Sequence, residues 1–513
     1  MSRYLNPVIP GFNPDPSVCR SGEDYYLVTS SFEFFPGVPV YHSRNLANWE
    51  LIGHCLTHNE QLPLGNCPAS AGIYAPTIRC HEGLFYMVTT NVSAGGNFIV
   101  HTEDIRGPWS VPAPVDQGGI DPSLLFMNGK AYFCSNGHKG ESGVILCEVD
   151  PLTGKKLSVS TCIAHGTGGK APEAPHLYFI DGWYYLLMAE GGTEYGHMVT
   201  IQRSRELYGP YEACPHNPIL THRNRYPHPI QATGHADLFE DHKGNWWMVC
   251  LGIRPLPGAR VMLHNLGRET FLVPVTWENG WPVAGNNGAF ELEMEAPLPL
   301  PAVTRNFDFT ADFSSDFSVE KSAGSLSPHW NFIRNPEPKR YILDKDRLRI
   351  KGSDKRLSDP NTNPSFMGIR QQAFRIEAET VVSAETLSFV RAGISAYYND
   401  SYHYDLYLEQ GGDGTKAVVV NKRIHDLEAE TYRTPVKRET EDIRLRISSD
   451  LEQYHFAFRA GEEEWQDCGG GLAAGLCTEG TYRMTFTGVY IGLFCSGGEA
   501  EFKSFSLVQR EEL

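Results

Sequence analysis

The feature that most constrains the fold of this chain is a sequence pattern that recurs five times in its N-terminal half. Each copy joins a short polar element to a turn signal and then to a run rich in Tyr, Phe, Trp and Val. Such runs have the length and composition of β-strands. The copies begin 60, 46, 52 and 62 residues apart, at Asp15, Ala75, Asp121, Glu173 and His235. Five units of this size, each with room for roughly four strands, predict a five-bladed β-propeller.

The repeat stops near residue 296, where the composition changes. The segment APLPLPAVT is rich in Pro and predicts a linker over 296–306. Beyond it, closely spaced strand-like runs such as HYDLYLEQ and YHFAFRAG continue without the repeated phrase and predict a β-sandwich. Long amphipathic helical stretches are nearly absent. The predicted class is therefore all-β, with a propeller over 1–295 followed by a concanavalin- or jelly-roll-like sandwich over 307–513.

The charge balance argues against several kinds of partner. With 44 basic and 61 acidic side chains the net charge is −17, whereas nucleic-acid binding needs a basic surface. No run approaches 18 apolar residues, so no membrane-spanning helix is expected. The chain does not start like a signal peptide, and its twelve cysteines show no C-x-x-C pair or zinc-type spacing. We therefore expect buried free thiols in a cytoplasmic protein that binds neither nucleic acid nor membrane.

The heads of the repeats carry the candidate chemistry. In a propeller, equivalent strand starts form a ring at one mouth of the central channel. Asp15, Asp121 and Glu173 occupy three of the five positions, and His235 occupies a fourth. Each Asp-Pro alone is explained equally well by a turn before a strand. Three converging carboxyl groups are costly, because proximity disfavours ionising all of them, and they indicate function. Acids with separated pKa values suit glycosidic cleavage, in which one protonates the leaving oxygen and the other activates water or attacks.

Seven short motifs of the chain are informative together, although any one of them is weak. They are FNPDPS (12–17), SFEFFPGVPVYHSRNLANW (31–49), GGIDPSL (118–124), PEAPHLY (172–178), AEGGTEYGHM (189–198), GHADL (234–238) and LGRETF (266–271). As a set they resemble the motifs of glycoside hydrolase family 43. The resemblance extends over the propeller and the trailing sandwich, so it covers essentially the whole chain.

The resemblance implies roles for the acids. Asp15 matches the general base that activates water, and Glu173 matches the general acid. Asp121 matches a third carboxylate that raises the pKa of the acid and holds it in place. The family works by inversion, which implies a separation of roughly 6.5–9.5 Å between the two working carboxyl groups, leaving room for a water. Arg268 matches a substrate-binding arginine, with a surface or inter-domain ion pair as the alternative.

Other residues are expected to shape the pocket. Phe32 and Tyr74 are predicted walls, because apolar sugar faces stack on aromatic rings, although a plain core role is the alternative. The xylosidase branch of the family usually has Trp at the position of Tyr74, so the preferred linkage stays open. His235 is predicted in the channel beneath the substrate, with a buried core histidine as the alternative. No cofactor is needed for the chemistry, and no metal ligands are assigned. A structural calcium near His235 is left open, although one His cannot build its site.

The sandwich lacks an acid constellation of its own. Its segment FTGVYIG (486–492) resembles a family loop that covers the pocket, and a covered pocket implies exo action on chain ends. The alternative is a sandwich that only stabilises the propeller. The resulting hypothesis is an inverting exo-glycosidase that releases β-D-xylosyl units from xylooligosaccharides and also acts as an α-L-arabinofuranosidase. Two rivals are a principal α-L-arabinofuranosidase and a non-catalytic, carbohydrate-binding propeller. A homo-oligomer is left open.

Overall fold

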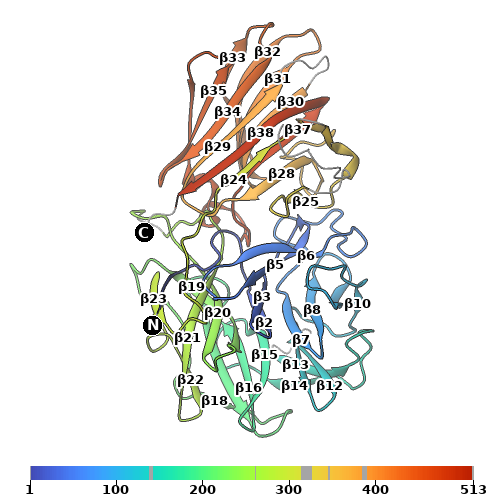
Figure 1. Cartoon of the computed structure of the whole chain (residues 1–513), viewed down its shortest axis with the longest axis vertical. Coiled ribbons are helices and arrows are strands. Elements are labelled where there is room, and N and C mark those ends of the chain that lie inside the picture. The colour runs from blue at the N-terminus through green and yellow to red at the C-terminus, as the bar shows by residue number, and fades with distance from the viewer. Residues whose placement is uncertain are drawn as a thin grey trace.

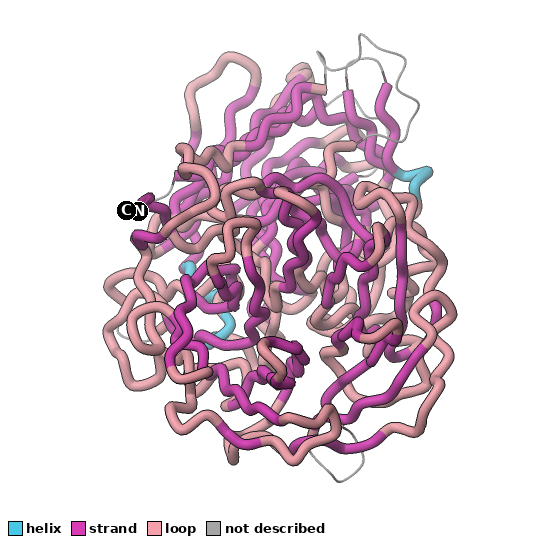
Figure 2. Tube along the Cα trace, turned by 60° about the horizontal axis from the view of Figure 1, so that its bottom comes forward, coloured by secondary structure: helices cyan, strands magenta, loops and turns pink. Residues whose placement is uncertain are grey.

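The computed structural model describes residues 2–137, 143–259, 262–313, 326–344, 347–383 and 390–510. Within them the helical elements are three 3-10 turns, η1 (Pro338–Arg340), η2 (Ala473–Leu476) and η3 (Thr478–Gly480). Figure 2 shows a trace of strands and loops with only brief helical turns. The all-β class is therefore confirmed. No helix in the described ranges is long and apolar enough to cross a membrane.

Five four-stranded antiparallel sheets follow one another in the first part of the chain. The first two contain β2 (Ser17–Ser21), β3 (Asp24–Val28), β5 (Gly37–Ser43) and β6 (Glu50–Leu56), then β7 (Thr77–His81), β8 (Leu84–Asn91), β9 (Gly96–Thr102) and β10 (Ala113–Pro114). The third and fourth contain β11 (Ser123–Met127), β12 (Lys130–Asn136), β13 (Val144–Val149) and β14 (Thr161–Ala164), then β15 (Glu173–Ile180), β16 (Trp183–Glu190), β17 (Met198–Ser204) and β18 (Glu212–Ala213). The fifth contains β19 (Gln231–Glu240), β20 (Trp246–Ile253), β21 (Glu269–Glu278) and β22 (Trp281–Ala284).

These sheets are blades around one axis. The innermost strands touch in sequence, β2 with β7, β7 with β11, β11 with β15 and β15 with β19, and β19 returns to contact β2. Among the described residues no strand is shared between blades, and the N-terminal segment instead joins the fifth blade to the first. There β1 (Ser2–Leu5) pairs with β23 (Glu293–Ala296), and Ile9 bridges to Thr270 of the fifth blade. The predicted five-bladed propeller is confirmed.

The turn signals of the repeat have a direct structural meaning. In the hairpins that open blades two, three and four, both turn residues have positive φ, as in Asn128 (φ 51°) and Gly129 (φ 71°). A two-residue turn of this kind matches the twist of the flanking strands, and Asn, Asp and Gly tolerate it best. The turn residues thus set the register of the innermost hairpin of each of these blades. That register determines which residue begins the strand beside the channel.

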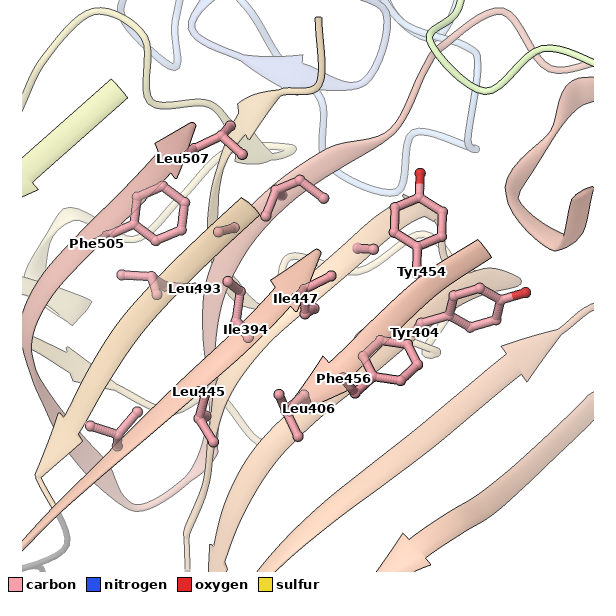
Figure 3. Packing of buried hydrophobic residues seen from close by; sticks show 14 of the residues in the cluster. Ile394, Tyr404, Leu406, Leu445, Ile447, Tyr454, Phe456, Leu493, Phe505 and Leu507 are labelled. Atoms are coloured by element: carbon pink, nitrogen blue, oxygen red, sulfur yellow. The ribbon is translucent and has the colours of Figure 1, made fainter. Parts of the chain in front are cut away.

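The C-terminal part is a sandwich of two antiparallel sheets. Its six-stranded sheet contains β28 (Ser365–Arg370), β30 (Val390–Asn399), β31 (Tyr402–Gln410), β32 (Lys416–Ile424), β33 (Leu427–Val436) and β37 (Tyr490–Gly497). The facing sheet contains β24 (Phe309–Asp312), β26 (Tyr341–Asp344), β27 (Arg347–Lys351), β29 (Arg375–Ser383), β34 (Asp442–Ser449), β35 (Gln453–Ala460), β36 (Gln466–Leu472) and β38 (Glu499–Arg510). Ile394 and Leu493 of one sheet share a buried cluster with Leu445 and Phe505 of the other (Figure 3).

The sandwich lies on the propeller through the outer face of its six-stranded sheet (Figure 1). There β25 (Phe332–Ile333) pairs with β4 (Phe34–Phe35) of the propeller, and Phe34 stacks on Tyr490 with ring centroids 4.1 Å apart. Phe12 joins the same buried cluster. Tight apolar packing of this kind holds two domains in a fixed relation. The limits proposed for the domains and linker, at 295/296 and 306/307, stay a prediction.

Candidate active site

The three predicted acids emerge at equivalent points of three blades. Asp15 lies just before β2, Asp121 lies just before β11, and Glu173 is the first residue of β15. Asp15 (φ 56°), Asp121 (φ 54°) and His235 (φ 45°) share the left-handed backbone conformation, as does Ala174 (φ 52°), which follows Glu173. Strain of this kind persists where the surrounding fold imposes it, often at functional sites. The repeated backbone geometry turns these side chains toward one place.

All seven sequence-predicted site residues line a single cavity of about 110 Å³. Four further residues complete its lining, and one of them comes from the sandwich. The predicted set is Asp15, Phe32, Tyr74, Asp121, Glu173, His235 and Arg268, and the additional residues are Ala75, Ile120, Thr193 and Phe486. The geometry therefore assembles residues that span more than half of the chain, while their individual catalytic roles stay predictions.

Asp15 lies in surroundings that favour its ionised form. Its Oδ1 accepts a hydrogen bond from Nη1 of Arg268 at 2.9 Å, and its Oδ2 accepts one from the Ser30 hydroxyl at 2.5 Å. Nδ1 of His235 lies 3.5 Å from Oδ1. Burial alone would raise the pKa of Asp15, but the charge of Arg268, with His235 and Ser30, outweighs it and lowers that pKa. Asp15 is thus a carboxylate at neutral pH.

The surroundings of Glu173 and Asp121, unlike those of Asp15, favour the protonated form. Burial, followed by the negative charge of Asp15, raises the pKa of Glu173 to about 7. Burial, followed by the charges of Glu173 and Asp15, also raises the pKa of Asp121. Asp121 Oδ2 accepts a long hydrogen bond, 3.3 Å, from the backbone N–H of Ala174. The two carboxyl groups therefore titrate as a pair that retains a proton near neutral pH.

Arg268 links the acids to the rest of the pocket. Besides Asp15, its Nη1 donates to the Thr193 hydroxyl at 2.9 Å, and its Nη2 donates to the backbone oxygen of Phe486 at 3.5 Å. Its guanidinium carbon lies 5.7 Å from the centre of the Phe32 ring. The alternative of a surface or inter-domain ion pair is wrong, since its carboxylate partner is Asp15 inside the pocket.

Aromatic rings from both domains form one wall of the cavity. The Phe32 ring lies 5.3 Å from Tyr74 and stacks on Phe486 at 5.6 Å, and Tyr74 meets Phe486 edge-on at 6.0 Å. Phe486 belongs to the segment expected to cover the pocket, and its backbone N–H donates to the Ser70 hydroxyl. A Cβ on Gly488 would lie 2.3 Å from the backbone oxygen of Leu266, so this segment packs backbone against backbone beside Arg268.

Sequence reasoning missed three residues near the acids. Ser30 and Thr193 are common hydroxyl residues without a distinguishing pattern, although Thr193 lies in one of the quoted motifs. His197 is fully buried, and its Nε2 lies 3.7 Å from Oε1 of Glu173. Its ring also interacts with the backbone of Ala232. Burial lowers the pKa of His197 to about 3, so it is a neutral neighbour of the proposed acid.

A structural calcium near His235 stays a prediction. The histidine is buried, and burial lowers its pKa despite the nearby charge of Asp15. Calcium takes six to eight oxygen ligands, whereas His235 offers one imidazole. The described part of the chain contains no group of three or more His, Cys, Asp or Glu that could hold a metal ion. A cation here would depend mainly on water, and no chemical step is derived through one.

Comparisons with known proteins give a consistent result. A model of glycosyl hydrolases family 43 matches residues 4–282, and a model of the β-xylosidase C-terminal concanavalin A-like domain matches residues 316–507. A non-reducing end α-L-arabinofuranosidase of Bacteroides ovatus is 40% identical over 96% of this chain and 91% of its own length. A xylosidase/arabinosidase of Butyrivibrio fibrisolvens is 40% identical over 80% of each chain. The crystal structure of a xylan β-1,4-xylosidase from Bacillus halodurans superposes with a TM-score of 0.90 at 31% identity, covering 99% of this chain and 100% of the other.

Proposed function

This chain belongs to glycosyl hydrolase family 43, and on that premise we propose that it is an inverting, exo-acting pentosidase. Its substrates are xylo- or arabino-oligosaccharides. It releases terminal β-D-xylosyl units and, at the same pocket, α-L-arabinofuranosyl units. A non-catalytic, carbohydrate-binding propeller is not favoured, since the relatives that match along nearly the whole chain are named as glycosidases.

The opposite charge states of Asp15 and Glu173 carry this proposal. Asp15, ionised beside Arg268, takes a proton from a water that attacks the anomeric carbon. Glu173, with its pKa raised to about 7, gives its proton to the leaving oxygen. One proton enters Asp15 as another leaves Glu173, so no covalent intermediate is needed and the configuration inverts. Burial and the charge of Asp15 keep the pKa of Glu173 high, Asp121 holds the acid in place, and Arg268 binds sugar hydroxyls.

Exo action is supported by the small size of the cavity and by its aromatic wall. At about 110 Å³ it is well below the range of drug-sized pockets, and it suits a single sugar ring better than a chain. Phe32, Tyr74 and Phe486 supply an apolar wall on which a pentose face can stack. Phe486, which reaches the pocket from the sandwich, blocks extension of a bound chain on that side.

The balance between the two sugars is the open part of the specificity. A principal α-L-arabinofuranosidase is the second candidate, favoured by the name of the Bacteroides relative and by Tyr74 in place of Trp. The decisive experiment compares kcat/KM on p-nitrophenyl β-D-xyloside and α-L-arabinofuranoside, with the anomer of the product followed by NMR. Hydrolysis of both with inversion supports the proposal. Inactivity on both, or retention of configuration, overturns it.

We also propose that the enzyme works in the cytoplasm on imported oligosaccharides. All twelve cysteines are free thiols, and ten of them are buried. Buried thiols that form no cross-links are typical of proteins that fold in a reducing compartment. Fractionation of the native host with an antibody against the chain tests this, and recovery in the culture medium would contradict it.

A further inference from the structure

One buried carboxyl group beside the pocket has no part in the mechanism. Glu33 lies between Phe32, which lines the catalytic cavity, and Phe34, which stacks on Tyr490 of the sandwich. It is only 2% exposed. Burial raises the pKa of Glu33 to about 7, although hydrogen bonds and the charge of Arg334 act in the opposite direction. Since burying an acid is costly, the contacts that Glu33 makes need an explanation.

The side chain of Glu33 holds a propeller loop that runs over 66–73. Its Oε2 accepts a hydrogen bond from the backbone N–H of Ser70 at 2.9 Å. Ser70 has a φ of 61°, in the left-handed region, which a residue other than Gly keeps only where its surroundings impose it. The bond from Glu33 is such a contact, because it fixes the peptide unit that leads into Ser70.

The same serine holds the aromatic residue that the sandwich contributes to the pocket. The Ser70 hydroxyl accepts a hydrogen bond from the backbone N–H of Phe486 at 3.0 Å. Glu33, Ser70 and Phe486 are therefore joined by two successive hydrogen bonds that cross from the propeller to the sandwich. If the first bond is lost, Ser70 is free to rotate, and its hydroxyl no longer faces Phe486.

The far end of the loop contacts the other two rings of the wall. Phe32 (φ 48°) and Ile73 exchange backbone hydrogen bonds at 2.9 and 3.1 Å, and Tyr74 follows directly. Gly72 approaches the same backbone so closely that an added Cβ would lie 2.4 Å from the oxygen of Phe32. A displacement of the loop over 66–73 therefore reaches Phe32, Tyr74 and Phe486 together.

Arg334 holds the beginning of this loop from the sandwich side. Its Nε donates to the backbone oxygen of Cys67 at 2.6 Å, and its Nη1 donates to that of Thr362 at 2.7 Å. Its Nη2 lies 3.6 Å from Oδ2 of Asp400. Its backbone N–H donates to the backbone oxygen of Glu33 at 2.8 Å. The loop is thus held from both domains at the point where they meet.

We propose that Glu33 is a positioning residue of the catalytic pocket. It holds the loop over 66–73 so that Phe32, Tyr74 and Phe486 form one wall, and it acts on a bound sugar only through these rings. That the wall receives a pentose rests on the proposed function. The catalytic acids lie outside this series of hydrogen bonds, so Glu33 serves substrate binding and not the chemical step.

The first test separates KM from kcat. Glu33→Leu removes the acceptor at similar volume and is expected to raise KM for p-nitrophenyl pentosides about fivefold, the effect of one hydrogen bond, with kcat within about twofold. Glu33→Gln keeps an acceptor oxygen and is expected to leave both constants within about twofold. If Glu33→Leu does not fold, Glu33→Asp, whose shorter side chain withdraws the acceptor from Ser70, takes its place with the same expectation.

Asp241→Leu is the matched control. Asp241 is also 2% exposed, but its partners Lys243 and Trp247 belong to a hairpin of the fifth blade. The substitution is expected to lower the melting temperature and to leave KM unchanged. A KM that rises equally in the Glu33 and Asp241 variants, or that does not rise in a folded Glu33 variant, overturns the proposal.

Ser70→Ala tests the second hydrogen bond with a smaller change. It keeps the N–H that Glu33 binds and removes the hydroxyl that holds Phe486, so KM is expected to rise about threefold. The double variant with Glu33→Leu is expected to resemble Glu33→Leu alone, because both substitutions break the same series of bonds. An unchanged KM in Ser70→Ala, or effects that multiply in the double variant, contradicts the proposal.

Hydrogen exchange keeps this inference separate from the proposed function. In the full chain without substrate, amides over 66–73 and 484–488 are expected to exchange about fivefold faster in Glu33→Leu than in the unchanged protein, and at the same rate in Asp241→Leu. Equal exchange in Glu33→Leu and the unchanged protein overturns the positioning role. If pentosides are not hydrolysed at all, the proposed function fails, and exchange still decides whether Glu33 holds the loop.

Discussion

The propeller and the sandwich contribute different kinds of residue to the catalytic pocket. The propeller supplies all of its carboxyl groups, its histidine and its arginine. Among the lining residues, the sandwich supplies only the uncharged ring of Phe486. The chemistry is thus confined to the repeating domain, whereas the shape of the site is shared between the two domains.

Charged residues of the sandwich act on the pocket indirectly. Glu479 of η3 accepts a hydrogen bond from the Tyr195 hydroxyl at 2.5 Å and lies 2.7 Å from Nδ1 of His264. Tyr195 and His264 belong to propeller segments that carry Thr193 and Arg268. We therefore expect substitutions in the propeller to remove a chemical step. Substitutions in the sandwich are expected to displace the catalytic groups and to lower activity less.

The largest expected effect is in the propeller. Asp15→Asn should lower kcat by a factor on the order of 10² or more, because it deletes the base at nearly constant shape. Steady-state kinetics on p-nitrophenyl pentosides measure this, with circular dichroism and melting temperature as the folding control. A well-folded Asp15→Asn protein of near-normal activity would remove Asp15 from the mechanism.

Glu173→Gln should cause a loss that depends on the leaving group. Substrates with poor leaving groups need protonation and should lose at least about 10² in kcat, whereas a dinitrophenyl glycoside needs little and should lose far less. A series of aryl pentosides of graded phenol pKa measures the dependence. Equal losses across the series would show that Glu173 is not the acid.

Asp121→Asn should change the pH profile as well as the rate. The wild-type profile should be a bell, since activity needs Asp15 ionised and Glu173 protonated, and its alkaline limb should fall as pH rises through about 7. Replacing Asp121 removes a negative neighbour, makes loss of the Glu173 proton easier and moves that limb to lower pH. We expect a roughly tenfold slower kcat. An unmoved alkaline limb in kcat/KM would contradict this coupling.

The site residues of the propeller differ in how they could be predicted from the sequence. The three acids head copies of one repeat, so aligning the copies places them in a ring without any family knowledge. Phe32, Tyr74 and Arg268 needed the resemblance, because nothing in their own spacing marks them. His197 and Thr193 lay within a quoted motif, yet only the folded chain shows which of its side chains turns toward Glu173.

Contacts between the domains were outside the reach of sequence reasoning. Nη1 of Arg370, at the end of β28, donates to Oδ1 of Asn13, a partner 357 residues away. No periodicity or local motif links such positions, since the contact depends on how two complete domains pack. The contacts of Glu479 with Tyr195 and His264 could not be predicted for the same reason. Phe486 was found only because its segment resembles a family loop.

Arg370 offers the sharper test of the sandwich. Asn13 is fully buried, and its backbone N–H donates to the backbone oxygen of Arg268 at 3.0 Å, so it joins the segments of Asp15 and Arg268. Arg370→Met removes the hydrogen bond that anchors Asn13 from the sandwich. We expect kcat to fall about tenfold and the acidic limb, which reports Asp15, to move.

Arg446→Met is the control for this substitution. Arg446 pairs with Glu379 within the sandwich and lies over Trp465, away from the propeller. It is expected to change stability without changing the pH profile. If both variants lose activity only in proportion to their melting temperatures, Arg370 is a stabilising residue and does not position the base.

The smallest expected effect is at Phe486. Phe486→Ala removes the ring that stacks on Phe32 and meets Tyr74 edge-on, which should raise KM for p-nitrophenyl pentosides about threefold to tenfold with kcat nearly constant. The acids are untouched, so the pH profile should stay in place.

Opening the wall should also narrow the preference for disaccharides over longer oligosaccharides, measured as the ratio of kcat/KM on xylobiose and xylotetraose. The KM of Phe486→Leu, which keeps an apolar side chain, should lie between the KM of the unchanged enzyme and that of Phe486→Ala. A large fall in kcat with constant KM would show that the sandwich takes part in the chemical step itself, and the division of labour between the two domains would then be wrong.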